Sequence, residues 1–404
     1  TNGISHFISN YIMKHIFFLF SVLFTIIFIS SCNLNTTSHE YRDVCDNTIV
    51  IGVTRQDLID FKPGLLFDKF DLIPLEESAE SLVGVIKKMV VKDSAIFILD
   101  DTRKILLKFD AIGKYLGQIG SIGRGQGEYL QLADFQVSRD TILLWDYRQK
   151  KMAFYTLDGS FIKEQVTNDY FLSFAKLDND YWVYTAGINE EGSGKEGFNL
   201  RNYKGNLNSN DIFDFLPASN FYPRTFNKTN IFNYGDSAIF SFGLSNVIYR
   251  ISNSGIHPYI FVDAGKNSIP YNTIKDQPLS MQECSDYVNN NDYIGIISNC
   301  LESSRYLYFN VTETKTGELI HTIYDKVDKK SLSFKDIVED DSNVIISGTP
   351  CFIDDVYFYY LLPSFYFDIP NIEEFIKQYC ISDTYTINNY NTILIRARIK
   401  DSLK

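Results

Sequence analysis

The chain has 404 residues and a formal net charge of −12 at neutral pH. This acidic balance disfavours a nucleic-acid partner, because neutralising phosphate groups requires basic patches. Aromatic residues make up 15% of the chain, with 27 Tyr and 32 Phe. Ala-rich helical periodicity is nearly absent. Since aromatic residues are enriched in strands, the composition indicates an all-β protein.

The first residues have the pattern of an export signal. Met13, Lys14 and His15 begin a short basic region, residues 16–29 are almost wholly apolar, and two serines precede Cys32. A charged start, an apolar stretch and small residues before the cleavage site are typical of a secretory signal. The apolar stretch is shorter than the about 20 residues that a transmembrane helix needs. We therefore expect residues 1–31 to comprise a signal peptide preceded by upstream residues, with Met13 as a plausible initiator.

Cys32 is the candidate lipidation site. Ile-Ser-Ser-Cys at residues 29–32 resembles the lipobox of bacterial lipoproteins, in which the cysteine is lipidated and becomes the mature N-terminus. The alternative is an ordinary signal peptide with an incidental cysteine. Residues 32–69 are polar and weakly patterned, so they lack the apolar surface to fold alone. We expect them to form a lipid-anchored tether.

A repeat organises the rest of the sequence. Residues 95–119 are followed 46 positions later by a degraded copy at residues 141–165. Each copy predicts strand, turn, strand, tight turn and strand, with Gly113 and Gly159 closing the tight turns. A fourth strand is expected at residues 133–137. A period near 46 residues with four short strands is the signature of a propeller blade or a comparable β array.

The remaining length predicts about six such units, because a blade takes ~40–50 residues. We expect ring closure by pairing of strands from both chain ends, with residues 392–399 as the final strand, since an open ring would leave a long edge. Polar stretches at residues 277–291 and 372–380 indicate insertions, with some helical character. More diverged copies predict the third to sixth units at residues 180–205, 236–255, 306–317 and 351–362.

Several motifs together resemble a known family. They are Ile-Pro-Leu-Glu at 73–76, Leu-Val-Gly at 82–84, the segment from Phe-Asp to Gly-Lys at 109–114, and the glycine-rich loop at 120–129. Together they resemble the six-bladed β-propeller lipoproteins of Bacteroidetes, which are related to NHL-repeat propellers. The resemblance is strong over residues 70–165 and weaker afterwards. Gln126 and Thr392 stand where the family pattern has Pro.

This resemblance implies a fold and a location. Residues 70–404 are expected to form a six-bladed β-propeller of four-stranded antiparallel blades, anchored in the cell envelope by lipid. In similar lipoproteins, acidic residues directly after the lipidated cysteine are associated with export to the cell surface. No such cluster follows Cys32, which favours a periplasm-facing anchor. Removal of Lys14 with the signal takes the net charge from −12 to about −13.

One rim of the predicted propeller is the candidate binding surface. The second and fourth strands of a four-stranded meander run in the same direction, so the turn at Asp100 and the loop at Gly120 emerge on one face. Tyr and Arg are favoured anchors of interfaces. The alternative for Asp100 and Asp146 is that each merely satisfies the backbone of its turn. The candidate rim residues are Asp100, Asp101, Arg103, Arg124, Glu128, Tyr129, Asp146, Tyr147 and Arg148.

Motifs for catalysis and cofactor binding are missing. The loop at residues 120–127 lacks the Gly-Lys-Ser/Thr of a phosphate-binding loop, so its glycines are better explained as sharp turns between blades. After Cys32 only His39, His257 and His321 remain, without the spacing of a zinc or iron site. Neither an EF-hand motif nor Gly-x-Ser-x-Gly occurs. We predict no catalytic residue, metal ligand or cofactor.

Five cysteines follow Cys32, and their odd number and irregular spacing do not predict a disulfide framework. Cys284 and Cys300 could form a bridge within an insertion. The alternative is that most of the cysteines are small buried hydrophobes. The full set is Cys45, Cys284, Cys300, Cys351 and Cys380.

These observations favour a non-catalytic envelope lipoprotein whose propeller rim binds a protein, peptide or glycan. The competing hypothesis is a propeller enzyme of the lactonase, dehydrogenase or lyase type with a metal in the central channel. Only fold analogy supports that hypothesis. A third hypothesis is a purely structural spacer.

Overall fold

The structure is a computed structural model. It describes residues 48–185, 198–209, 212–217, 230–241, 245–269, 283, 286–287, 290–335, 348–362, 377–381 and 392–400. Residues 50–404 form one compact unit. The predicted signal peptide, Cys32 and most of the predicted insertions at 277–291 and 372–380 lie outside the described residues. None of the helices in the described part is long and apolar enough to cross a membrane.

The sequence repeat folds into two consecutive four-stranded sheets. In both copies the strands pair in the same register, because Ile96 lies opposite Phe109 and Ile142 lies opposite Tyr155. The first blade contains β3 (Ile86–Lys92), β4 (Ala95–Asp100), β5 (Ile105–Asp110) and β6 (Tyr115–Ile119). The second contains β9 (Leu132–Ser138), β10 (Thr141–Asp146), β11 (Lys151–Thr156) and β12 (Phe161–Val166).

Four further sheets follow, at the places that the diverged copies predict. The third blade contains β13 (Ser173–Leu177), β14 (Asp180–Tyr184), β15 (Phe198–Tyr203) and β16 (Ile212–Pro217). The fourth contains β17 (Ile231–Tyr234), β18 (Ser237–Phe240), β19 (Val247–Ser252) and β20 (Gly255–Asp263), with β1 (Ile49–Gly52) at its outer edge. The fifth contains β21 (Ile294–Glu302), β22 (Tyr306–Glu313), β23 (Leu319–Asp325) and β24 (Lys330–Phe334). The sixth contains β25 (Phe352–Ile353), β26 (Tyr357–Leu361), β27 (Ile393–Ile399) and β2 (Phe67–Pro74).

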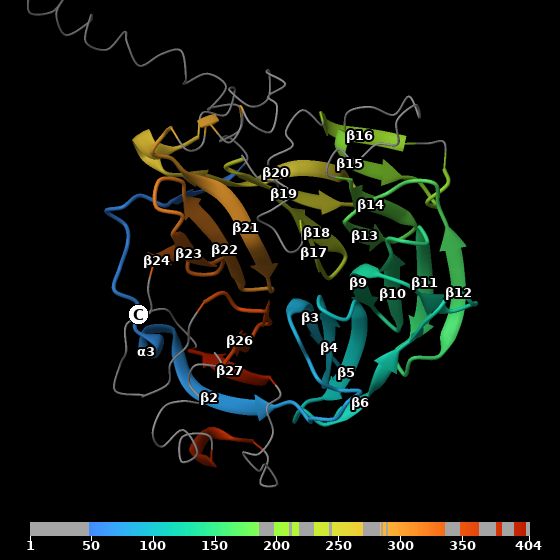
Figure 1. The fold of residues 1–404 in the computed structure, drawn as a ribbon. Helices are drawn as coiled ribbons and strands as arrows, with labels where there is room; N and C mark the ends of the chain where they lie inside the picture. The colour runs from blue at the N-terminus through green and yellow to red at the C-terminus, as the bar shows by residue number, and fades with distance from the viewer. Residues whose placement is uncertain are drawn as a thin grey trace, which may run out of the picture. The chain divides into compact units, whose positions relative to one another are not determined.

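The six sheets form a closed ring (Figure 1). The first strand of each blade is innermost, and β3, β9, β13, β17, β21 and β25 each contact the next, with β25 returning to β3. This arrangement is a six-bladed β-propeller of four-stranded antiparallel blades, as the sequence predicts. Radial packing covers both faces of every sheet and leaves only short edges exposed.

The ring is closed by the first and last strands of the propeller. β2 pairs with β27 in an antiparallel manner, so the sixth blade is built from both ends of the domain. An ion pair of 2.7 Å between Arg396 and Asp71 crosses this seam, and Arg398 pairs with Asp68. The predicted closing strand at residues 392–399 is confirmed.

Residues 50–66 form a strap along the outer edges of three blades (Figure 1, blue). The N–H of Val53 donates to Asp263 O at the end of β20 (2.8 Å), and the N–H of Ile59 donates to Ser333 O of β24 (2.9 Å). The ring of Phe61 stacks on Phe334 with centroids 4.1 Å apart. The strap ends with α3 (Pro63–Leu66), and β2 follows directly. Residues 50–69, which the sequence predicts as tether, therefore pack on the propeller.

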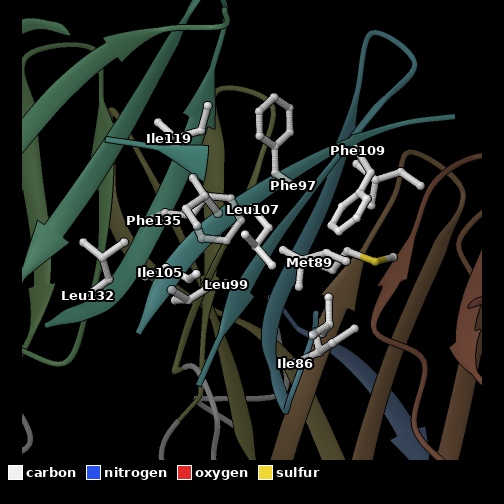
Figure 2. Close-up of a cluster of buried hydrophobic side chains, with 14 of the residues drawn as sticks. Ile86, Met89, Phe97, Leu99, Ile105, Leu107, Phe109, Ile119, Leu132 and Phe135 are labelled. Carbon is white, nitrogen blue, oxygen red and sulfur yellow. The ribbon is translucent and has the colours of Figure 1, made fainter. Parts of the chain in front are cut away.

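Apolar side chains fill the space between neighbouring blades. Residues of the first blade such as Phe97 and Leu107 pack together with Phe135 of β9, as Figure 2 shows. All three are essentially inaccessible to solvent. Burial of this apolar surface between sheets is the main favourable contribution to folding. It also fixes the loops of adjacent blades relative to each other.

Candidate functional site

The connecting face is the side of the ring where the chain passes from one blade to the next. The turns between the second and third strands also emerge there. The turns on the opposite face are short, whereas the β2–β3 and β6–β9 connections on the connecting face each have more than ten residues. Long loops on a rigid scaffold are where binding residues concentrate. All nine candidate rim residues lie on the connecting face, in the first two blades.

Asp100 and Asp146 have the same role in the two blades. Asp100 Oδ2 accepts a hydrogen bond from Gly84 N (3.1 Å), and its Oδ1 accepts from Thr102 N (2.8 Å) in the turn. Asp146 Oδ2 accepts from Leu130 N (2.7 Å), 46 positions after Gly84, and its Oδ1 accepts from its own turn. Both carboxylates are buried. They tie the turn to the segment that enters the same blade, which is the structural role that the sequence left open.

Tyr129 is also buried, beneath the glycine-rich loop. Its hydroxyl accepts a hydrogen bond from Gln118 Nε2 (2.9 Å) and donates to Ile119 O (3.2 Å). Burial raises the pKa of Tyr129 well above its ordinary value. Tyr129 therefore supports the loop from below, and like Asp100 and Asp146 it is not accessible to a partner on the connecting face.

The remaining rim residues differ in whether their side chains have hydrogen-bond or ion-pair partners within the protein. Arg103 donates to the carbonyl oxygens of Glu80 and Leu82 (both 2.9 Å), and Asp101 pairs with Lys104 (2.5 Å). Glu128 Oε2 accepts from Gly125 N (2.6 Å). These three side chains stabilise their own loops.

Arg124 and Arg148 are exposed, and neither guanidinium contacts a carboxylate within the described part of the chain. Tyr147 lies beside Arg148 in the β10–β11 turn, and its ring is 5.3 Å from that of Tyr170. Lys150 Nζ lies 3.8 Å over the ring of Tyr170. Together these residues form a cationic and aromatic surface on the second blade.

Sequence reasoning missed Lys150 and Tyr170. Lys150 matches Lys104 in the repeat, and both have positive φ in the same turn, so this equivalence is a detectable signal. Tyr170 lies between β12 and β13, outside the repeated segment, and no sequence signal places it beside Tyr147.

The glycine-rich loop is a structural connection. Gly120 and Gly127 have φ of 67° and 70°, which confirms the predicted sharp turn from the outer strand of one blade to the inner strand of the next. A short parallel pairing of β7 (Ser121–Ile122) with β8 (Glu128–Tyr129) holds the loop together. Backbone N–H groups that a phosphate would need instead donate hydrogen bonds to carboxylates. Gly127 N, for example, donates to Glu164 (3.0 Å).

The buried histidine and the buried cysteine of the described residues, His321 and Cys300, have structural surroundings. His321 Nδ1 is 2.7 Å from the hydroxyl of Tyr308, and the imidazole stacks on Phe334. Cys300 is a buried free thiol, and burial raises its pKa to about 12. Cys284, the partner that the sequence suggested for Cys300, lies outside the described residues. Within the described ranges, no group of three or more His, Cys, Asp or Glu side chains could hold a metal ion.

These features define a six-bladed β-propeller with a cationic and aromatic patch on its connecting face. The chain belongs to the family described as "Domain of unknown function (DUF4934)", whose model matches residues 48–390. No curated protein matches the sequence.

Among solved structures, the chain is similar to a Bacteroides fragilis protein that is described as exported. The TM-score is 0.62 at 19% identity, over 88% of this chain and 100% of that one. A member of the DUF4221 family from Bacteroides vulgatus gives a TM-score of 0.49 at 10% identity, over 83% and 97% of the two chains. Virginiamycin B lyase from Staphylococcus aureus gives 0.37 at 13%, over 67% and 75%. At these identities the likeness concerns the fold alone.

Proposed function

We propose that this protein is an exported, non-catalytic scaffold, anchored to the cell envelope through lipid on Cys32, whose connecting face binds a partner protein or peptide. The observation that carries the proposal is the exposed pair Arg124 and Arg148, which contact no carboxylate in the described part of the chain. The lipobox-like segment before Cys32 supports export and anchoring. The similar Bacteroides fragilis protein that is described as exported also supports it.

The chemistry of the patch favours a partner segment that carries carboxylate groups. Guanidinium groups bind carboxylates through two parallel hydrogen bonds, and Arg and Tyr are enriched among residues that dominate binding energy. Lys150 and Tyr170 extend the patch with a cation and an aromatic ring. Because the chain is net negative, a local cationic patch would orient an acidic partner towards this face.

The first experiment locates the partner on the surface. A benzoylphenylalanine photo-crosslinker in place of Tyr147 on the connecting face is compared with the same group in place of Tyr115. Both tyrosines are half-buried, and Tyr115 lies after a β5–β6 turn on the opposite face. We expect a specific cross-linked envelope protein at position 147 and none at position 115. Equal cross-linking at both positions contradicts the proposed face.

The second experiment measures affinity for the purified cross-linked partner. We expect the double variant Arg124→Gln/Arg148→Gln to weaken binding by at least about tenfold, since charge-assisted hydrogen bonds each contribute about 1.5–3 kcal/mol. Lys114→Gln/Lys329→Gln, which removes the same charge from exposed residues on the opposite face, should leave affinity unchanged. Unchanged affinity in the arginine variant would refute the proposal. Competition by a soluble acidic glycan and not by an acidic peptide would instead indicate a glycan partner.

A further inference from the structure

A cavity of about 320 Å³ opens on the opposite face, where the second, third and fourth blades meet. Three cationic side chains from three different elements line it. Arg139 lies in the β9–β10 turn, Lys163 on β12 and Lys176 on β13. Arg139 and Lys163 belong to the second blade and Lys176 to the third, so the packing of these two neighbouring blades brings the three cations together.

The three cations are close enough to affect one another. Burial and the charges of Lys163 and, more weakly, Arg139 hold the pKa of Lys176 below its ordinary value, and they outweigh the opposing charges of Asp178 and Asp180. Like charges that share a site repel each other, and an added anion relieves this repulsion. The arrangement therefore favours a negatively charged ligand.

Carboxylates around the cavity leave part of this charge unbalanced. Asp236 is 3.8 Å from Arg139, and both side chains are about four-fifths exposed, so their attraction is weak. Asp178 Oδ2 accepts a hydrogen bond from Asn253 (2.5 Å), while Lys176 donates to the backbone oxygen of Asp178. Lys163 has no carboxylate partner within the described part of the chain, and its Nζ lies 4.9 Å from the ring of Phe154. Among the residues that line the cavity, three cations thus face two carboxylates. Asp180, whose charge also acts on Lys176, is paired with Lys204 (2.7 Å).

The walls of the cavity combine apolar and polar side chains. Leu143, Phe154 and Leu177 line it but are at most 5% exposed, so Ile162, which is 47% exposed, offers apolar surface that a ligand can contact. A cavity near 300 Å³ with apolar walls and a few convergent polar groups is in the size range of small-ligand sites. An inorganic anion would contact the cations and leave this apolar surface unused.

We propose that this cavity binds a small organic anion, in which a carboxylate or phosphate group is attached to an apolar body. The anionic group lies among Arg139, Lys163 and Lys176. The apolar body lies against Ile162 and the accessible edges of Leu143, Phe154 and Leu177. The site is on the opposite side of the ring from the connecting face. Its occupation is therefore independent of the partner binding proposed above.

Calorimetric titration of the purified propeller with four probes tests this site. Octyl phosphate and octanoate carry the two candidate anionic groups, octyl glucoside carries the same alkyl chain without charge, and inorganic phosphate carries the charge without the chain. We expect saturable one-to-one binding of octyl phosphate, octanoate or both. Octyl glucoside and inorganic phosphate should each bind at least about tenfold more weakly, since each lacks one of the two contacts.

Variants distinguish binding in the cavity from nonspecific attraction of the anionic probes to exposed cations. Lys163→Gln should weaken binding of the anionic probes by at least about tenfold. Lys114→Gln, which removes one exposed charge elsewhere on the same face, should not change it. The connecting-face variant Arg124→Gln/Arg148→Gln should retain full binding. Thermal melting of each variant verifies that the fold is intact, which is expected because Lys163 is exposed.

Four results overturn the inference. They are the absence of saturable binding of both anionic probes, equal weakening in Lys163→Gln and Lys114→Gln, undiminished binding of octyl glucoside, and equally tight binding of inorganic phosphate. The last result would identify a site for free anions instead of amphipathic ones.

Discussion

Lys88 on β3 and Asp134 on β9 form a buried ion pair between the innermost strands of the first two blades, with 2.8 Å between Nζ and Oδ1. The two residues are 46 positions apart, so they occupy the same place in the two repeats. Asp134 Oδ2 also accepts a hydrogen bond from Phe174 N of β13 (3.0 Å). One side chain thereby links the inner strands of three consecutive blades.

Removing the cation of this pair should strongly destabilise the propeller. Lys88→Met leaves the Asp134 carboxylate buried without its counter-charge, and we expect a loss of about 3–5 kcal/mol in the free energy of unfolding. The double variant Lys88→Met/Asp134→Asn should be more stable than Lys88→Met, because the amide is uncharged and keeps an acceptor for Phe174 N. Chemical denaturation measures both. A double variant that is less stable than Lys88→Met contradicts the charge argument.

Gly120 and Gly205 form a matched pair for the glycine-rich loop, since φ is positive at both. A Cβ atom at Gly120 would lie 2.6 Å from the hydroxyl oxygen of Tyr155, whereas one at Gly205 meets nothing within 4 Å. We expect Gly205→Ala to lower the free energy of unfolding by about 1 kcal/mol, from backbone strain alone. Gly120→Ala should cost about 3 kcal/mol or more, because overpacking adds to the strain. Equal losses in urea denaturation would show that the close contact with Tyr155 is unimportant.

The strap should contribute to stability even though its sequence looks like a linker. Phe61 is inaccessible to solvent and stacks on Phe334, so Phe61→Ala should lower the free energy of unfolding by about 3–5 kcal/mol. Leu65 in the same segment is 38% exposed, and Leu65→Ala should cost about 1 kcal/mol or less. Thermal and chemical melting of the two variants provides the comparison. A negligible effect of Phe61→Ala would mean that the strap is dispensable.

Acid should weaken the seam between β2 and β27. Burial favours the neutral form of Asp71, but hydrogen bonds from Lys69 and Arg396 outweigh it and hold the pKa of Asp71 below its ordinary value of 3.8. A carboxyl group with a lowered pKa in the folded state stabilises the protein above the unfolded pKa, and this contribution disappears as the pH falls through the folded pKa. The stability difference between the wild type and Asp71→Asn should therefore be constant from pH 5 to 7 and shrink below about pH 4. A difference that does not change with pH contradicts this assignment.

Lipidation at Cys32 remains a sequence-based prediction that a labelling experiment can test. In a bacterial host with lipoprotein processing, the wild type should incorporate labelled palmitate and sediment with membranes. Cys32→Ala should do neither, and Cys45→Ala should behave like the wild type. Label in the Cys32→Ala protein, or its absence from the wild type, would exclude the proposed anchor.

Sequence reasoning located the blades because each must alternate short apolar strands with turns of fixed chemistry. Ile96, Asp100 and Gly113 recur at their equivalent positions because a propeller repeats one backbone conformation, and the same turn needs the same residues. The repeat pattern did not predict the strap. Its buried residues Val53 and Phe61 are too sparse to form a period, since each contacts a different blade.

The two binding surfaces depend on contacts that repeats do not encode. Sequence topology placed Arg124 and Arg148 on one face, but it could not show that Tyr129 would be buried beneath the loop. The cavity was missed entirely. Lys163 and Lys176 belong to adjacent blades, and only the angle at which those blades pack decides that their charges meet.

The order of contacts along the strap determines how the ring would respond to mechanical load. Tension that enters the chain before residue 50 first reaches the pairing of β1 with β20, then the ion pair of Arg55 with Asp292, and then the stack of Phe61 on Phe334. Only after these have ruptured does the pull reach β2. Under the proposed lipid anchor, the first failure would therefore occur outside the ring, and the closure of the propeller would survive it.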